Sequence, residues 1–323
     1  MEQIQNKQRV LITGAAGNLG NLLAQHLKEN TAFELNLLIH KKDIAENLKT
    51  DSNVRVFKAD LVDKHSLVNS LQGVDTVVHF AGVLFKANPE KFLPLTNVHY
   101  FNNLLETAIE QKVKRIILIS FPHVEGETTP QQPACGSLDK KPISAHAQTR
   151  LEEEKQLFEK CKKNNIEAVS LRVGMVYGKG ILMIDAAQWF AKYNLLGVWR
   201  KPTFIHLISK DDFVKSLEAA IQKPEINGIY HIGDDGIQSL QEFLDIITVY
   251  KGNRKPWRMP VWMIMTAARL FEMVSAIFGT KSPLTRDFIR IGMVSYYGDT
   301  SRMRKELLST LKYPTFKDGL DIF

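Results

Sequence analysis

The stretch ITGAAGNLG, residues 12–20, follows a short apolar run and opens a segment whose leucines recur at helical spacing. Its glycines have the spacing GxxGxxG, at Gly14, Gly17 and Gly20. A strand followed by glycines and a helix over 18–29 is typical of a βαβ unit. Such glycines permit a tight turn and let a pyrophosphate approach the backbone at the positive end of the helix. The alternative is a tight turn that binds nothing.

The same alternation of strand and helix continues through the first half of the chain. Near-continuous apolar strands that alternate with helices predict a parallel sheet covered on both faces. The expected fold class is therefore α/β, a doubly wound Rossmann sheet. Strands are predicted at 33–40, 54–60, 76–82, 115–120 and 167–177, and helices at 97–111 and 145–163.

After Gly178 the pattern loosens, which indicates a second, smaller lobe. We expect residues 1–178 to form the dinucleotide-binding domain and residues 179–323 mainly a substrate-binding lobe. Within that lobe, residues around 205–235 are expected to return to the Rossmann core.

Composition narrows the classes of function. The chain has 323 residues and a formal net charge of +7, but no basic stripe interleaved with aromatic residues, so nucleic-acid binding is not expected. The two cysteines, Cys135 and Cys161, form no metal-binding pattern, and no metal is expected. The chain enters a strand-like run within its first ten residues, so a cytoplasmic protein is expected.

The end of the second predicted strand bears on the choice of cofactor. About twenty residues past the glycines, an NAD site usually places an acid against the ribose 2′-hydroxyl. Here His40 is followed by Lys41 and Lys42, whose charge would attract a 2′-phosphate. The sequence therefore favours NADP over NAD, with an ordinary solvated basic loop as the alternative.

Together these segments resemble the extended short-chain dehydrogenase/reductase superfamily, which includes the NAD-dependent epimerases and dehydratases. The resemblance rests on TGAAGNLG, KADLVD at 58–63, VVHFAG at 77–82, NVHYFNNLLETA at 97–108, RIILIS at 115–120 and LRVGMVYGKG at 171–180, with YYGDTSRMRKEL and YPTFKDGL in the C-terminal part. These motifs identify the superfamily and no particular substrate.

The resemblance implies a set of cofactor-binding residues. Asp60 and Leu61 would flank the adenine, Phe80, Ala81 and Gly82 would pass beneath the ribose and diphosphate, and Ser120 would lie near the nicotinamide ribose. The full set comprises Gly14, Gly17, Asn18, Leu19, Gly20, His40, Lys41, Asp60, Leu61, Phe80, Ala81, Gly82, Ser120 and Arg150.

The catalytic positions of this superfamily are altered in the chain. Aligned on RLEEE, His146 takes the place of the usual tyrosine and Arg150 that of the lysine in YxxxK, while Phe121 takes the serine position. The literal YxxxK at Tyr313–Lys317 lies near the C-terminus and is interpreted as coincidence. His146 and Arg150 share one helical face, and a histidine with an ordinary pKa of about 6.5 can pass protons at neutral pH. We therefore expect His146 and Arg150 to be catalytic, with His146 as the proton donor.

Three functions remain open on this basis. The first is an NADP-dependent oxidoreductase that acts on a carbonyl or hydroxyl of a small or apolar substrate. The second is a non-catalytic protein that binds the dinucleotide, and the third is a nucleotide-sugar epimerase or dehydratase. His123 and Cys135 can also face a substrate, although ordinary loop roles are the simpler interpretation.

The segment Met259–Gly279 is apolar nearly all round. A buried helix or a subunit contact, as in a homodimer, is the simpler interpretation. The alternative is contact with a membrane surface through 256–279, since Lys255 and Arg258 stand beside Trp257 and Trp262.

Overall fold

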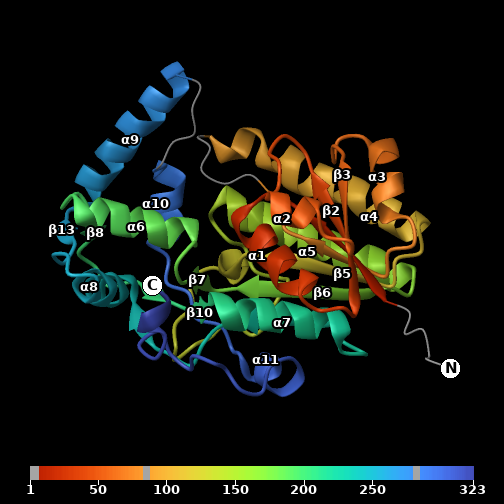
Figure 1. Ribbon diagram of the computed structural model, residues 1–323. Helices are drawn as coiled ribbons and strands as arrows, with labels where there is room; N and C mark the ends of the chain where they lie inside the picture. The colour runs from red at the N-terminus through yellow and green to blue at the C-terminus, as the bar shows by residue number, and fades with distance from the viewer. Residues whose placement is uncertain (1–6, 83–87, 279–283) are drawn as a thin grey trace.

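The structure, a computed structural model, describes residues 7–82, 88–278 and 284–323. Its centre is a seven-stranded parallel sheet in the order β11-β6-β5-β4-β1-β2-β3 (Figure 1). The strands are β1 (Gln8–Thr13), β2 (Phe33–Ile39), β3 (Val54–Lys58), β4 (Thr76–His79), β5 (Arg115–Ser120), β6 (Glu167–Val173) and β11 (Gly228–Ile232). This is the doubly wound Rossmann sheet expected from the alternating pattern.

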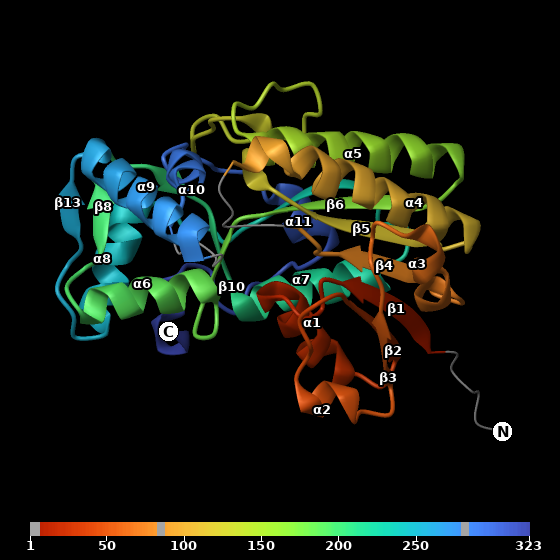
Figure 2. The ribbon, with the colours of Figure 1, turned by 90° about the horizontal axis from the view of Figure 1, so that it is seen from above.

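Helices cover both faces of the sheet (Figure 2). On one face lie α1 (Asn18–Lys28) and α7 (Lys210–Gln222), and on the other α3 (Lys64–Leu71), α4 (Tyr100–Glu110) and α5 (Ala145–Lys163). Side chains alternate along β1, so Val10 joins the core beneath α1 while Leu11 joins the core beneath α4. Burial on both faces explains why these strands read as continuous apolar runs.

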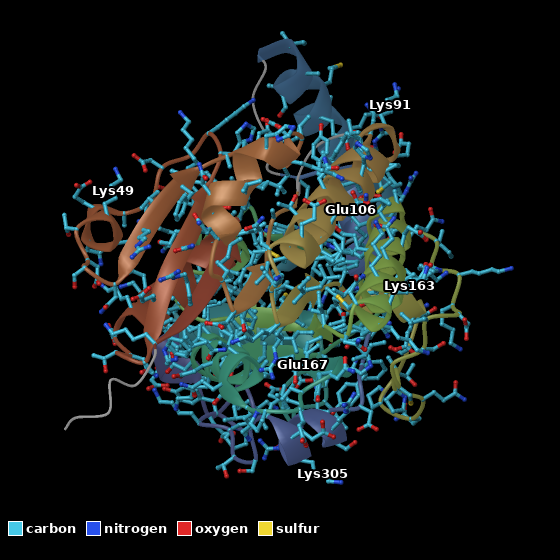
Figure 3. All side chains as sticks on the ribbon, turned by 90° about the vertical axis from the view of Figure 1, so that its right-hand side faces the viewer. Lys49, Lys91, Glu106, Lys163, Glu167 and Lys305 are labelled. Carbon is cyan, nitrogen blue, oxygen red and sulfur yellow. The ribbon has the colours of Figure 1, made fainter. Side chains whose placement is uncertain are left out.

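The helices of the second face are also tied by charge. Glu106 on α4 accepts hydrogen bonds from Lys64 on α3 and from Lys160 on α5, the latter at 2.6 Å (Figure 3). These two lysines hold the pKa of Glu106 well below its ordinary value, at about 2. The carboxylate thus joins three consecutive helices across the surface of that layer.

Two predicted elements are divided in the structure. The strand predicted over 167–177 ends at Val173, and β7 (Met175–Tyr177) leaves the sheet to pair with β10 (Leu207–Ser209). At the break, a Cβ on Gly174 would lie 2.5 Å from the carbonyl oxygen of His206. The predicted helix over 97–111 begins as a π-helix at Pro94–His99 and continues as α4.

The second lobe lies at one end of the sheet (Figures 1 and 2). Short strand pairs join its segments, β8 with β13 and β9 with β12. Its elements are α6 (Leu182–Lys192), β8 (Gly197–Trp199), β9 (Phe204–Ile205), β12 (Gln238–Ser239), α8 (Leu240–Tyr250), β13 (Trp257–Met259), α9 (Val261–Phe278) and α10 (Arg286–Gly292). Two further helices, α2 (Glu46–Lys49) and α11 (Ser301–Glu306), belong to the sheet end of the molecule.

Helix α9 differs from the expectation of a buried helix. It is not buried within the chain, because only a narrow stripe that includes Ile264, Ala268 and Ser275 faces inward. Most of its other apolar side chains are exposed, and in Figure 1 the helix projects from the lobe. Helical periodicity could not show this, since a helix that is apolar all round carries no signal for the side it buries. Among the described residues, no helix has both the length and the apolar character needed to cross a bilayer.

Candidate functional site

The turn between β1 and α1 packs against the turn that follows β4. Gly14 has a φ of +69°, in the left-handed region that favours glycine. A Cβ on Gly14 would lie 3.0 Å from the backbone nitrogen of Ala81. Glycine is therefore required here both by the backbone conformation and by the close approach of the two turns.

The next two glycines of the stretch have different roles. Gly17 is the N-cap of α1, and it has no side chain to cap the N–H groups of the first turn. Those groups, which no acidic side chain in that turn neutralises, can receive an anion. A Cβ on Gly20 would lie 2.5 Å from the carbonyl oxygen of Gly14, closer than the 3.0 Å of a Cβ on Gly17. Gly20 therefore closes the turn, whereas Gly17 leaves the approach to the helix end open.

The side chains of Asn18 and Leu19, both predicted to bind the cofactor, make their contacts within the protein. Asn18 Nδ2 donates to the Gly180 carbonyl at 2.7 Å, and Asn18 Oδ1 accepts the Leu182 N–H at 3.0 Å. Leu19 packs against the hydrophobic core. The start of α1 is thus fastened to the start of α6, which joins the glycine turn to the second lobe.

A buried pair supports the turn after β4. Thr13 Oγ1 lies 2.8 Å from His79 Nδ1 and accepts the Ala81 N–H at 3.4 Å. Burial, with a smaller effect of Arg150, lowers the pKa of His79 to about 3, so its imidazole is neutral near pH 7. Phe80 is half-buried and packs edge-on against Phe213 of α7. These contacts fix the backbone at 80–82.

Arg150 lies against this turn from α5. Its Nη2 donates to the Ala81 carbonyl at 3.5 Å, and a Cβ on Gly82 would lie 2.6 Å from the same nitrogen. Its Nη1 donates to Glu153 Oε2 at 2.7 Å. Glu153 is fully buried, and burial raises its pKa to about 8 against the opposing effect of Arg150. Glu153 thus holds the guanidinium beside the turn after β4.

His146 lies one helical turn before Arg150, as the spacing predicts. It is largely buried, and its Nε2 lies 3.4 Å from Asp287 Oδ2 of α10. Burial and then the neighbouring Arg150 lower the pKa of His146 to about 4. The pKa therefore lies below the ordinary value assumed from the sequence, and the imidazole is neutral near pH 7. The role of His146 in proton transfer stays a prediction. A neutral imidazole accepts a proton more readily than it supplies one.

His40 and Asp60 lie side by side at the ends of β2 and β3. His40 Nε2 is 3.3 Å from Asp60 Oδ2, and both side chains are about half exposed. Lys41 is exposed beside them, and Leu61 is partly buried against the core beneath α4. An acid therefore stands next to the basic cluster that favoured NADP, and it offsets part of that positive charge.

Ser120 belongs to a buried polar network instead of an open site. Its hydroxyl donates to Glu154, which also receives Ser170 Oγ at 2.8 Å. Arg172 donates to Glu154 Oε2 at 2.6 Å and is also paired with Glu125. Arg172 is fully buried, so these two carboxylates compensate its charge inside the protein. The network joins α5, β5 and β6 to the loop after β5.

That loop contains the other candidate residues. The Phe121 and His123 rings are 4.8 Å apart, and His123 Nε2 lies 3.1 Å from the Val294 carbonyl. Burial lowers the pKa of His123 to about 4. Cys135 is exposed, and its backbone N–H donates to Glu125 at 3.3 Å. His123 therefore packs within the loop, whereas the Cys135 side chain is exposed.

Several residues of the site were not identified from the sequence. Glu153 carried a signal, since it follows Arg150 by three positions on the same helix. Thr13 and His79 stand at the ends of adjacent strands, where side chains of a parallel sheet meet. Asp287 carried no signal, because it comes from a weakly patterned segment of the second lobe.

Comparison with known proteins agrees with this architecture. The model of the NAD dependent epimerase/dehydratase family matches residues 10–233. A uronate dehydrogenase of Pseudomonas syringae pv. tomato is 26% identical over 230 residues, which cover 70% of this chain and 75% of that protein. A UDP-glucose 4-epimerase of Vibrio cholerae is 24% identical over 290 residues, which cover 84% and 85% of the two chains.

Solved structures show the same fold over nearly the whole chain. A UDP-glucuronic acid 4-epimerase of Bacillus cereus, in complex with NAD, has a TM-score of 0.75 at 20% identity and covers 98% of this chain and 97% of its own. The dTDP-glucose 4,6-dehydratase of Streptomyces venezuelae, with NAD bound, has a TM-score of 0.77 at 19% identity, with 97% and 94% covered.

Proposed function

The chain belongs to the NAD dependent epimerase/dehydratase family, and we propose that it is a nicotinamide-dependent oxidoreductase that acts on a hydroxyl or carbonyl group. The observation that carries this proposal is the position of α5. It holds His146 and Arg150 on one face, with Arg150 against the turn after β4 and His146 beside the second lobe. In this proposal His146 is the proton-transfer group, and it lies between the residues that would hold the cofactor and the lobe that would hold the substrate.

The residues at the carboxyl ends of β1 and β4 fit a dinucleotide. Gly14 and Gly17, in the turn before α1, place no side chain over the N–H groups at the start of the helix, as a bound pyrophosphate needs. Arg150, which remains charged at any ordinary pH, can donate to ribose hydroxyls from its place beside Ala81. When bound, the nicotinamide ring would accept or supply the hydride.

For His146 we propose the role of general base. The substrate hydroxyl would give its proton to the neutral imidazole as its carbon loses the hydride. Asp287, 3.4 Å from Nε2, would orient the ring and stabilise the imidazolium once it forms. Near pH 7 the lowered pKa leaves the imidazole unprotonated, which is the form that oxidation of an alcohol requires.

The substrate class follows from the relatives. The uronate dehydrogenase and the UDP-glucose 4-epimerase named above are 26% and 24% identical to this chain. We therefore propose a sugar-like or other small hydroxyl compound, bound between α5 and the second lobe. NADP is the proposed cofactor, since Lys41 stands beside the end of β2, although Asp60 weakens the positive charge there.

A second candidate, a protein that binds the dinucleotide without chemistry, is favoured by Phe121. An aromatic ring packed on His123 takes the position where the family usually has the substrate-orienting serine. This ring cannot donate a hydrogen bond to a substrate oxygen. An epimerase or dehydratase would return the hydride to the sugar within each cycle, with no net change in cofactor absorbance. Chromatography of the sugar products is therefore the assay for that function.

The test is a direct titration of NADP and NAD in both redox states, paired with absorbance assays over a panel of uronates, aldoses and nucleotide sugars. Cofactor binding with turnover of a hydroxyl substrate would support the oxidoreductase. Binding without turnover on any compound of the panel would favour the non-catalytic function. Absence of binding would overturn both.

A further inference from the structure

The end of the second lobe carries a continuous set of exposed apolar side chains. On α9 these are Val261, Trp262, Met263, Leu270, Phe271, Met273, Val274 and Ile277, with exposed fractions between 39% and 71%. A soluble protein exposes single apolar residues commonly, but a helix with most of its surface exposed and apolar marks an interaction site. We refer to these eight residues as the α9 face.

Aromatic side chains of the neighbouring elements extend the α9 face. Trp189 and Tyr193 of the α6 end have ring centroids 4.9 Å apart, and both are more than half exposed. Trp257 of β13, 63% exposed, donates from its Nε1 to the Asn194 carbonyl at 3.0 Å. The views agree that α6, β13 and α9 gather at the same end of the molecule (Figures 1 and 2).

The charges around this surface are mainly positive. The segment KGNRKPWR at 251–258 has four cations and no acid. Arg254 and Lys255 are exposed and form no ion pair with any residue that the structure describes. Arg269 is exposed on α9, and Lys192 lies 5.9 Å from the Tyr193 ring centre.

The acids of the same elements are engaged elsewhere. Asp245 pairs with Arg258 at 2.7 Å, and Glu272 pairs with Arg286 at 2.7 Å. Asp185, in the first turn of α6, accepts the Gly180 N–H at 3.2 Å and lies at the opposite end of that helix from Tyr193. The surface therefore combines apolar side chains, Trp and Tyr at its border, and uncompensated positive charge.

We propose that the α9 face docks on an anionic lipid bilayer. Trp and Tyr are favoured at the boundary between acyl chains and headgroups, and Lys and Arg are attracted to anionic lipids. Because α9 has an inward stripe and carries Arg269, it would lie along the membrane surface. A symmetric dimer fits less well, since it would bring the same basic patch against its own copy.

The experiment is co-sedimentation of the full chain with vesicles of stated composition. One set contains equal parts of phosphatidylcholine and phosphatidylglycerol, and the other contains phosphatidylcholine alone. We expect binding to the anionic vesicles that weakens as salt is raised, because salt screens the attraction. Failure to bind the anionic vesicles at low salt would overturn the proposal.

Two pairs of matched variants separate the apolar and the electrostatic parts. Leu270→Ser with Ile277→Ser should weaken binding at least about tenfold, whereas Ile143→Ser with Ile237→Ser, also more than half exposed but elsewhere, should not. Arg254→Glu with Lys255→Glu should also weaken it at least about tenfold. Lys140→Glu with Lys141→Glu makes the same change in net charge at another surface and is the control.

Circular dichroism and thermal unfolding establish that each variant is folded. Equal loss of binding in a test pair and its control would mean non-specific adsorption, and would overturn the proposal. Light scattering of the protein without lipid tests the alternative, in which a second copy of the chain covers the α9 face. A stable dimer that Leu270→Ser with Ile277→Ser turns into a monomer would show that a second copy covers the α9 face.

Discussion

His146 of α5 and Asp287 of α10 meet at the boundary between the Rossmann sheet and the second lobe, with Nε2 and Oδ2 3.4 Å apart. The carboxyl group comes from the lobe and the imidazole from the helix that carries Arg150. The second lobe therefore supplies the carboxylate that lies beside the imidazole proposed as the base.

His146→Ala should lower the rate of alcohol oxidation by about 10²–10⁴-fold and leave cofactor affinity nearly unchanged. Because burial and Arg150 lower the pKa of His146 to about 4, the basic form is already present at pH 7. The native rate should thus stay level through neutral pH and fall only as the pH approaches that value. A pH profile of kcat checks this. His99→Ala, at an exposed histidine, is the control.

Full activity in His146→Ala would rule out an essential base at this position. A rate that falls through pH 6–7, about the ordinary pKa of histidine, would show that the imidazole is less buried in the working enzyme.

Lys41→Glu should weaken NADPH binding at least about tenfold, because a charge-assisted hydrogen bond contributes about 1.5–3 kcal/mol. NADH, which lacks the 2′-phosphate, should be affected far less. Asp60→Asn should strengthen NADPH binding, since it removes the carboxylate 3.3 Å from His40. Titration of both cofactors measures the preference. Lys305→Glu, on α11 (Figure 3), makes the same charge change elsewhere. Equal loss of NADH binding would contradict the role of Lys41.

Gly17→Val should abolish binding of either cofactor while the protein remains folded. The φ of Gly17 is −80°, which any residue adopts, and its Cβ would lie 3.0 Å from the Gly14 carbonyl oxygen, a contact that a small shift relieves. The branched side chain would then cover the start of α1. Gly20→Ala should instead lower the unfolding temperature, because its Cβ would lie 2.5 Å from the Gly14 carbonyl oxygen. Calorimetry and cofactor titration on both variants distinguish these effects. Normal cofactor affinity in a folded Gly17→Val protein would show that the dinucleotide binds elsewhere.

Arg172→Ala should reduce the free energy of unfolding by about 3–5 kcal/mol, because it leaves Glu125 and Glu154 buried without their cation. Urea titration measures the loss. Lys163→Ala breaks the exposed pair with Glu159 and should change stability little (Figure 3). Similar losses in the two variants would mean that the buried network carries no special weight.

Much of the architecture follows from local sequence. Spacings of two to four residues in the sequence indicate the glycine turn, the strands and α5, because these spacings reflect the backbone geometry of each element. The same geometry places His146 above Arg150, and the expected limits of α5 and β5 are those of the structure. The break at Gly174 was missed because its cause, the carbonyl of His206, comes from a distant segment.

Such spacings could not predict the contacts and pKa values of the site. No local pattern relates His146 to Asp287 or His40 to Asp60, because these pairs form only when separate elements pack together. Packing also buries His146 and so lowers its pKa, which no local pattern could predict. For α9 the sequence specified an apolar helix, but only its attachment to the lobe left most of that apolar surface facing outward. Local sequence determines the secondary structure and the apolar or polar character of a segment. The burial of its side chains and their contacts depend on which other segments pack against it.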